Sequence, residues 1–483
     1  MKFRKIVLVL LLILAAVAAF WGYRSHQQKL AYAARYVCLA GVQYEKNATE
    51  LDLSGKPLAD LEDLKAFTGL KKLDLRGTQI SAQDYETLKL WFTEAEILWD
   101  IPFQGSFYPT DTEELTVSSM TQEDLEQLAY FNNLKRVTAE NCPDYPILHR
   151  LRLKNPDIQV SYTIPAAGAD YSYDTKSLVL PGLEAEALIP VLPYFTELET
   201  VELTAPMAPF DQIQALMDAV PQVQFSWNLE VAGIPVNQNT ETLDLTGIPM
   251  TVEEMDAVLP YLLSLTYVDM TDCGISNEDM DALNRRYEDI QIVWTVTLGK
   301  RFRIRTDVTH FMPVNHNFYP SGDDLHNLRY CTEIFALDLG HMGVENIDFV
   351  AYMPHLKYLL MCETLVRDLT PLTGLTELVY LELFMNEFTD LSPLATLTAL
   401  EDLNLHYVKG DPEPIAQMTW LKNLWWNNLE RYKLTPEQQQ MLRDAIPDCN
   451  FNFTSGSSTG GGWRELPNYY AQRDIFGVEY MVG

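Results

Sequence analysis

Seven strand-like segments of the L-x-L type, such as Leu-Asp-Leu and Val-Glu-Leu, carry a carboxylate at their middle position. These carboxylates are Asp52, Asp74, Glu202, Asp244, Asp269, Asp338 and Glu382. Because side chains alternate along a strand, the apolar neighbours would be buried while the carboxylates share the opposite face. Such a row suits a cationic partner or Ca²⁺, although no D-x-D-x-D-G loop supports calcium. The alternative is a solvated strand face, since nothing selects two carboxylates for acid–base catalysis.

Toward the C-terminus the corresponding positions become aromatic. The candidate ligand-binding residues are Tyr358, Tyr380, Glu382, Phe384, His406 and Trp425, with Tyr407 adjacent. Equivalent side chains on neighbouring strands lie ~5 Å apart, and exposed clusters of Tyr and Trp are typical of contacts with peptides, proteins or sugars. We therefore predict a ligand site at this patch. The alternative is that the C-terminal tail buries it.

One dense basic run lies beyond the N-terminus, at Lys300, Arg301, Arg303 and Arg305. The three arginines alternate with Phe302 and Ile304, which places them on one face of a strand. This arrangement indicates anion capture, for example of an envelope phosphate. The alternative is that the arginines pair with acidic residues on adjacent strands.

No arrangement of residues indicates a metal or cofactor. Histidines and aspartates mix in one stretch (His310, His316 and His326 with Asp307, Asp323 and Asp324), but their spacing matches no metal motif, and no C-x-x-C pair occurs. Six cysteines are too few for a disulfide scaffold, and Cys142, Cys273 and Cys449 are expected to be buried as small hydrophobes. We predict no catalytic residue, no cofactor and no enzyme. A net charge of −32, from 35 basic and 67 acidic residues, argues against nucleic acid.

The elements that position these residues begin after an apolar N-terminus. Lys2, Arg4 and Lys5 precede an apolar run over 6–23, which is long enough to cross a membrane as a helix. The leading cations predict a cytoplasmic N-terminus, with the remainder of the chain outside. The alternative is a signal peptide, cleaved after the Ala-Val-Ala segment at 16–18. In either case the rest of the chain is exported.

Two internal repeats organise the remainder. Gly41, Gly105, Gly168 and Gly233 are each followed ten residues later by a leucine that opens an L-x-[LV] segment, and with a degenerate copy at Gly299 they recur every 63 to 66 residues. From about 334 the beat shortens to 22 residues, as in Leu337, Leu359, Leu381 and Leu403. Helical starts such as Ser81-x-x-Asp84 and Thr121-x-x-Asp124 lie between the strands. One strand–loop–helix unit cannot bury its own apolar face, so the units are expected to stack.

At these motifs the chain resembles leucine-rich repeat proteins. The 22-residue repeats contain D-L-x-P-L at 368–372 and 390–394 and are similar to the internalin-type repeats of bacterial surface proteins. The earlier repeats resemble the helix-bearing ribonuclease-inhibitor type. The family's asparagine ladder position is occupied here by Thr78, Cys142, Cys273, Met342, Thr364 and Asn386. The resemblance implies an α/β leucine-rich repeat solenoid whose concave strand face binds partners without catalysis.

The predicted organisation has seven parts: a cytoplasmic N-terminus (1–5), a transmembrane signal anchor (6–23), a juxtamembrane linker (24–40), irregular repeats (41–298), an irregular joint (299–333), 22-residue repeats (334–453), and a Gly/Ser linker with an aromatic tail (454–483). We expect the tail to dock back onto the solenoid, or alternatively onto a partner. The predicted function is non-catalytic binding of a protein, peptide or glycan at the cell surface, through the concave face. The alternatives are a structural, self-associating envelope protein and, third, a hydrolase using the concave carboxylates.

Overall fold

The computed structural model describes residues 2–58, 60–426, 433–454 and 456–478. Met1, Ser455 and residues 479–483, which belong to the predicted N-terminus and tail, lie outside the described residues. The chain divides into two compact units, Met1–Trp227 and Asn228–Gly483. Each unit is built from repeats of the same strand–helix type.

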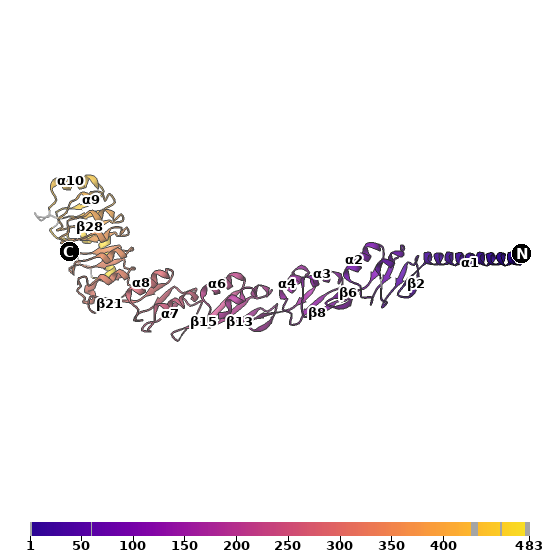
Figure 1. Ribbon diagram of the computed structural model, residues 1–483. Coiled ribbons are helices and arrows are strands. Elements are labelled where there is room, and N and C mark those ends of the chain that lie inside the picture. Colours follow the sequence, from indigo (N-terminus) through magenta and orange to yellow (C-terminus); the bar gives the residue numbers. More distant parts are fainter. Residues whose placement is uncertain (1, 59, 427–432, 455, 479–483) are drawn as a thin grey trace. The chain divides into compact units, whose positions relative to one another are not determined.

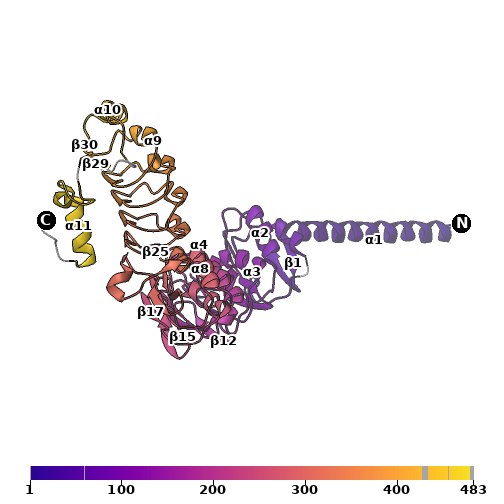
Figure 2. The ribbon, with the colours of Figure 1, turned by 90° about the vertical axis from the view of Figure 1, so that its left-hand side faces the viewer.

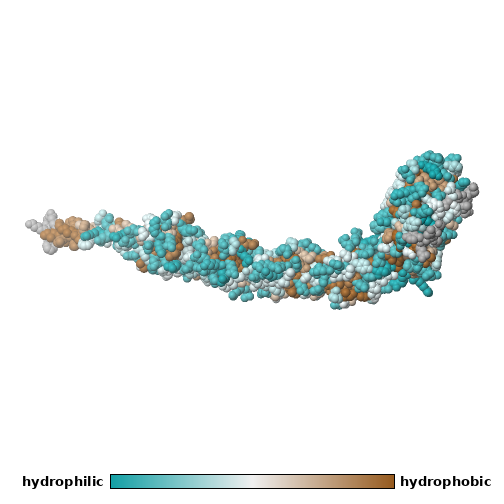
Figure 3. All heavy atoms as spheres, turned by 180° about the vertical axis from the view of Figure 1, so that it is seen from behind, coloured by the Kyte–Doolittle hydropathy of each residue, from teal (hydrophilic) through white to brown (hydrophobic). Residues whose placement is uncertain are grey.

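The first unit begins with one long helix, α1 (Lys2–Arg35). Its stretch Ile6–Arg35 is long and apolar enough, by length and composition, to cross a membrane, and no part of its most apolar segment is buried. Figure 3 shows this exposed apolar surface in brown. The helix continues through most of the linker predicted at 24–40, because residues 25–35 contain neither Gly nor Pro. The chain then turns into strand β1 (Tyr36–Leu39) rather than a linker.

Three parallel sheets of three strands follow in the first unit (Figure 1). They are formed by β3 (Glu50–Asp52), β4 (Lys72–Asp74) and β5 (Glu96–Leu98), by β8 (Glu114–Val117), β9 (Arg136–Ala139) and β10 (Gln159–Ser161), and by β13 (Ser177–Pro181), β14 (Thr200–Thr204) and the start of β15 (Gln224–Val231). The helices between the strands are α2 (Ala82–Trp91), α3 (Gln122–Gln127), α4 (Tyr145–Lys154), α5 (Ala185–Leu188) and α6 (Phe210–Ala219). Ser81 and Thr121 form capping boxes with Asp84 and Asp124, as the sequence predicted.

The 63- to 66-residue period marks β-hairpins. Strand pairs β1–β2 (Val42–Glu45), β6 (Asp100–Phe103)–β7 (Ser106–Pro109), β11 (Thr163–Ala166)–β12 (Ala169–Ser172) and β15–β16 (Ile234–Asn237) are antiparallel. In each pair the periodic glycine is the second of two turn residues with positive φ, for example Gln104 at 47° and Gly105 at 76°. Two such residues form a type I′ turn, which requires glycine-like freedom. The hairpin between β20 (Thr295–Leu298) and β21 (Phe302–Arg305) has the longer loop 299–301, which explains its degenerate motif.

The second unit carries one three-stranded sheet and one seven-stranded parallel sheet. The first consists of β17 (Thr242–Asp244), β18 (Tyr267–Asp269) and β19 (Gln291–Val293), with helices α7 (Val252–Asp256) and α8 (Asn277–Arg286). The second has the order β22 (His310–Phe311), β24 (Ala336–Asp338), β26 (Tyr358–Leu360), β27 (Tyr380–Glu382), β28 (Asp402–Asn404), β29 (Asn423–Trp425) and β30 (Asn450–Asn452). This sheet already begins at β22, inside the stretch predicted as an irregular joint at 299–333. A short ladder of β23 (Ser321–Gly322) and β25 (Gly343–Val344) accompanies it.

The 22-residue spacing of the leucines sets the register of the large sheet. Leu337, Leu359, Leu381, Leu403 and Leu424 are directly paired across successive strands, and each is fully buried. Single-turn helices and α9 (Glu413–Ala416) return the chain between strands, and α10 (Pro436–Ala445) precedes the last strand. Parallel strands in register, each followed by a short helical return, are the leucine-rich repeat architecture predicted from the sequence. The chain is thus an α/β leucine-rich repeat solenoid in each unit.

The tail folds back onto the large sheet. Residues 456–462 have no helix or strand and lead to a short 3-10 helix (Trp463–Glu465) and to α11 (Pro467–Phe476). In Figure 2, α11 lies along the side of the stacked strands opposite α9. The tail contacts the large sheet through Trp463, Tyr469 and Phe476, as expected for a tail that docks back onto the solenoid.

Candidate functional site

The strand register brings the predicted ligand-binding residues together. Tyr358 and Tyr380 are paired across β26 and β27. Glu382, Asn404 and Trp425 occupy the equivalent place on β27, β28 and β29. Tyr380 and Glu382 flank Leu381, so both project from the face opposite the leucine core. We call this surface of the seven-stranded sheet the strand face.

The tail covers the strand face. Tyr380, Trp425, Glu382, Phe384 and His406 are at most 6% exposed, and Tyr358 is half-buried. Trp463, Tyr469 and Phe476 of the tail form one apolar cluster with Ala336, Leu360, Tyr380 and Trp425. The structure therefore shows the alternative stated for this patch, in which the tail buries Tyr380 and Trp425, and exposure of the two residues, which a binding role would require, is not seen while the tail is docked. The two residues lie on β27 and β29, separated by β28, and both rings contact that of Trp463.

The indole of Trp463 fills a polar-lined pocket. Its Nε1–H donates to Glu382 Oε1 at 2.6 Å and lies 2.9 Å from Tyr380 Oη. The Tyr380 hydroxyl also donates to Glu382. The ring lies 5.4 Å from the Tyr380 ring and 5.3 Å, edge-on, from the Trp425 ring. Trp463 is itself fully buried, so the pocket encloses one whole aromatic side chain.

Side chains of the strand face bind the main chain of the tail. Trp425 Nε1–H donates to Gly460 O at 2.9 Å, and Asn404 Nδ2–H donates to Ser458 O at 2.9 Å. Three further carbonyls accept hydrogen bonds in the same way: Gly456 O from Tyr407, Gly461 O from Asn452 and Phe476 O from Asn315. Donors aimed at backbone carbonyls recognise a main chain whatever its side chains, and here that main chain is a turn at 456–462 and the end of α11. Sequence reasoning missed all three asparagines. Asn404 and Asn452 stand on β28 and β30, where an asparagine is a signal for such contacts, whereas Asn315 lies in the 3-10 helix Pro313–His316.

Burial shifts the ionisation of the groups under the tail. The pKa of Glu382 rises from 4.5 to about 7 and that of Asp338 from 3.8 to about 6, in both cases because burial disfavours the carboxylate. Burial also raises the pKa of Asp402, whose Oδ2 accepts a hydrogen bond from Asn468 of the tail at 3.0 Å. The pKa of His406 falls to about 4 because burial disfavours the imidazolium, and neither ring nitrogen has a hydrogen-bond partner among the described residues.

Five carboxylates of the row accept a backbone N–H in the loop after their own strand: Asp52, Asp74, Asp244, Asp269 and Asp338. Asp52 and Asp244 accept the backbone N–H two residues on, from Ser54 and Thr246, and Asp338 accepts that of Gly340. Hydrogen bonds from the side chains of Ser54 and Thr246, followed by those from their backbone N–H groups, hold the pKa of Asp52 and Asp244 below the ordinary value. Such bonds stabilise the sharp exit from a strand. The row therefore has a local structural use, and among the described residues no group of three His, Cys, Asp or Glu is placed to hold a metal ion.

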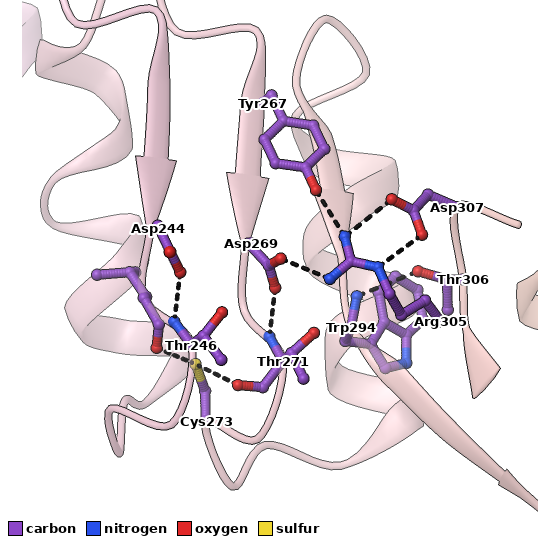
Figure 4. A network of polar contacts seen from close by, with 11 residues as sticks. Asp244, Thr246, Tyr267, Asp269, Thr271, Cys273, Trp294, Arg305, Thr306 and Asp307 are labelled. Atoms are coloured by element: carbon purple, nitrogen blue, oxygen red, sulfur yellow. Dashed lines mark hydrogen bonds and ion pairs between the residues drawn. The ribbon is translucent and has the colours of Figure 1, made fainter. Parts of the chain in front are cut away.

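The arginine run is divided between two environments. Arg305 bonds Asp269 at 2.6 Å, Asp307 at 2.9 Å and the Tyr267 hydroxyl at 2.7 Å (Figure 4). Arg303 pairs with Asp272. These two arginines follow the alternative of pairing with acidic neighbours.

Arg301 instead lines an open cavity of about 710 Å³ with Lys300, Phe302, His316, Asn317, Phe318, Ser321 and Asp324. Within it the Phe302 and Phe318 rings are stacked, with centroids 4.7 Å apart. His326 and His310 are not among the lining residues. The histidine-rich stretch is therefore not brought together at one point.

The cysteines behave as small buried groups. Cys142, Cys273 and Cys449 are buried as predicted, and all six cysteines of the chain are free thiols. At the ladder position Cys273 Sγ lies 3.2 Å from Leu245 O, the carbonyl of the preceding repeat. The Cys273 thiol, a weak hydrogen-bond donor, thus stands at the ladder position that is asparagine in other leucine-rich repeat proteins.

No protein-family model matches the chain, and no curated protein sequence matches it. Among solved structures, internalin C2 of Listeria monocytogenes is 21% identical over 30% of this chain and 74% of its own, with a TM-score of 0.23. An internalin F of the same organism is 13% identical over 87% of each chain, with a TM-score of 0.23. A leucine-rich repeat protein of Leptospira interrogans is 16% identical over 84% of this chain and 96% of its own, with a TM-score of 0.26. The leucine-rich repeat assignment rests on the spacing and strand register of this chain.

Proposed function

We propose that this chain is a non-catalytic leucine-rich repeat protein that binds a peptide or a protein segment on its strand face, outside a bacterial cell membrane. The observation that carries the proposal is the way the face holds the tail: side-chain donors of the sheet bind backbone carbonyls, and a pocket encloses one indole ring. The donors give affinity for peptide carbonyls, and the pocket gives selectivity for an aromatic side chain. A polypeptide fits this pattern better than a glycan, which lacks peptide carbonyls along its backbone.

The state of the carboxylates supports a binding role over hydrolysis. Glu382 lies under Trp463 and accepts hydrogen bonds from two residues of this chain. Asp52 and Asp244 hold the loops after their strands. A glycosidase needs two carboxylates flanking a substrate in an accessible pocket. The described carboxylates of the strand face do not form such a pair.

Helix α1 supports anchoring with the repeats exported. Its apolar residues are exposed along the helix, as lipid-facing residues would be. The competing reading is a signal sequence that is removed at 16–18. N-terminal sequencing of the protein from the envelope decides between them. We expect residues 2–35 to be retained and the protein to stay with membranes in alkaline carbonate, whereas a mature N-terminus near Ala19 would place the protein free outside the cell.

A structural role is the second candidate, and one observation favours it. Trp463 is fully buried and Tyr469 and Phe476 nearly so, as expected of a permanent cover. The two readings differ in what happens once the cover is weakened. A binding face then accepts a polypeptide in place of the tail, whereas a structural cover leaves an apolar surface without selectivity.

Selection from a random peptide library on the full-length protein in detergent micelles tests the proposal. The target carries Trp463→Ala and Phe476→Ala, which remove two anchors of the tail. We expect enrichment of Trp-containing peptides, lost when Trp425→Ala and Asn404→Ala are added. The matched control, Tyr470→Ala on the exposed side of α11, should not open the face. Enrichment without sequence preference, or enrichment indifferent to Trp425 and Asn404, would contradict the proposal.

A further inference from the structure

The tail differs from the rest of the chain in the kind of surface it buries. The leucine core of the second unit is one continuous cluster, and Trp463, Tyr469 and Phe476 belong to a separate, smaller cluster on the other face of the sheet. Around that smaller cluster lie hydrogen bonds to tail carbonyls at both ends of the segment, from Gly456 to Phe476. A mixed apolar and main-chain contact of this kind is the pattern of a bound peptide rather than of a repeat.

A glycine-rich segment connects the tail to the last repeat. Four glycines (456, 460, 461 and 462) lie in the segment that leads to Trp463, and Gly461 and Gly462 have positive φ of 62° and 93°. Such a segment gives little stiffness of its own. A short flexible tether holds its end at an effective concentration on the order of millimolar. The tail therefore competes strongly with any partner in solution, even where its own affinity is modest.

Charge distinguishes which partners can compete. Glu382 and Asp402 are buried beneath the tail and Asp338 is partly buried there, and Asp402 and Glu382 accept hydrogen bonds from Asn468 and Trp463 of the tail. The tail segment 456–478 is itself net neutral, with Glu465 and Asp474 beside Arg464 and Arg473, whereas the chain carries a net charge of −32. A competing segment thus needs an indole for the pocket. A segment with excess negative charge would be repelled by these three carboxyl groups.

We propose that residues 456–478 are an intramolecular pseudo-ligand, and that the partner of the strand face is a polypeptide segment without excess negative charge that carries a tryptophan, followed by a short helix with aromatic residues at the spacing of Trp463, Tyr469 and Phe476. The partner binds by displacing the tail. This inference rests on the proposed function and adds to it the class of partner and the competition. In the docked state Trp463 occupies the indole pocket. A partner can therefore bind there only after the tail of the same chain has left the strand face.

The expected size of the effect follows from the tether. If a free tail peptide binds an open face with a dissociation constant on the order of 10–100 μM, a tether at millimolar effective concentration weakens its apparent binding about 10- to 100-fold. The difference between a closed and an opened chain is therefore directly measurable.

Fluorescence anisotropy with a labelled peptide of residues 456–478 tests this on the full-length protein in micelles. We expect the W463A/F476A chain to bind the peptide 10- to 100-fold more tightly than the wild-type chain. A peptide carrying Trp463→Ala should lose binding, and so should one in which Arg464 and Arg473 are replaced by Glu. The Y470A chain should behave as wild type.

The outcomes separate the two proposals. Equal affinity of the wild-type and W463A/F476A chains would overturn the pseudo-ligand while leaving peptide binding intact. Binding by neither chain, together with failure of the library selection, would overturn both. If the double variant fails to fold, a full-length chain with a protease site inserted between Ser457 and Ser458 replaces it. After cleavage we expect the tail fragment to exchange with the labelled peptide, and a fragment that stays bound for days under excess peptide would identify a permanent cover.

Discussion

Trp463 Nε1 lies 2.6 Å from Glu382 Oε1, across 81 residues of sequence and inside a buried contact. Together with Tyr380 Oη–H, this indole N–H solvates a carboxylate that has lost its water. A buried carboxylate without donors is strongly unfavourable. The hydrogen bond therefore holds the tail on the strand face. If Trp463 moves away while Glu382 stays buried, the carboxylate loses a donor and the free energy of that state rises.

Trp463→Phe tests this hydrogen bond while retaining an aromatic ring. We expect docking of the tail to weaken by about 1.5–3 kcal/mol, because hydrogen bonds to charged groups contribute that much and Glu382 keeps only one donor. Hydrogen exchange of backbone amides in 463–476 should accelerate roughly 10- to 100-fold, since 1.4 kcal/mol is a factor of ten. Tyr470→Phe is the control, because its side chain is 43% exposed. Unchanged exchange in the Phe variant would show that shape alone holds the tail.

Glu382→Gln tests the pH dependence. Burial raises the pKa of Glu382 to about 7 in the folded chain, so the folded state binds the proton more tightly than the unfolded state. The resulting stability is fully present below about pH 4.5 and is lost as the pH rises through 7. Asp338, with a pKa of about 6, acts in the same direction, and nearby Arg464 opposes the shift of Glu382.

His406 acts in the opposite direction. Its pKa of about 4 in the folded chain lies below the ordinary value of 6.5, so its contribution to stability is lost as the pH falls from 6.5 toward 4. Between pH 6.5 and 8 the effect of Glu382 should therefore dominate. We expect urea unfolding of the wild-type chain to show a loss of about 0.8 kcal/mol from pH 6.5 to pH 8, because most of the roughly 3 kcal/mol between the acid and alkaline limits of Glu382 is lost between pH 4.5 and 6.5, where His406 opposes it. The slope should largely disappear with Gln, and an unchanged slope would assign it to other groups.

The sequence predicted the repeats well because their rules are local. The period of Gly41, Gly105, Gly168 and Gly233 follows from type I′ turns, which only a few residue types adopt. The 22-residue leucine beat fixes strand register directly. The environment of Tyr380 was not predictable in the same way. A strand-face tyrosine has the same local sequence whether solvent, a partner or Trp463 covers it, and a flexible linker leaves the destination of the tail undetermined.

Arg305→Ala tests the paired arginine. Arg305 joins Asp269 of β18 to Asp307, and the two carboxylates would repel each other without it (Figure 4). The Arg305 side chain is 39% exposed, so water compensates part of the loss. We expect a loss of about 1–2 kcal/mol in the stability of the second unit, measured by urea unfolding. The loss should shrink at high salt as the carboxylate repulsion is screened.

Arg301→Ala is the matched control for that measurement. It removes an exposed arginine of the same hairpin that lines the cavity at 299–324, and its cost should stay within about 0.5 kcal/mol. Equal costs for the two variants would mean that the bonds of Arg305 contribute nothing beyond an exposed charge.

Asn386→Ala tests the one ladder asparagine among the six positions. Asn386 Nδ2–H donates to Met361 O at 2.7 Å and Leu383 O at 2.9 Å, and its Oδ1 accepts from the backbone N–H and the hydroxyl of Thr364, both at 2.9 Å. Asn386 is 3% exposed, so alanine leaves several buried polar groups without partners. Each such group costs about 1–3 kcal/mol.

We therefore expect Asn386→Ala to lower the free energy of unfolding by about 3 kcal/mol or more, with faster amide exchange in the two repeats it joins. Asn346→Ala, at an exposed asparagine that bonds Asp348 in its own loop, should cost no more than about 1 kcal/mol. The contrast separates a bond between repeats from a bond within a loop. Should both variants lose the same small amount, the parallel strand ladder and the leucine core would hold neighbouring repeats together without help from Asn386.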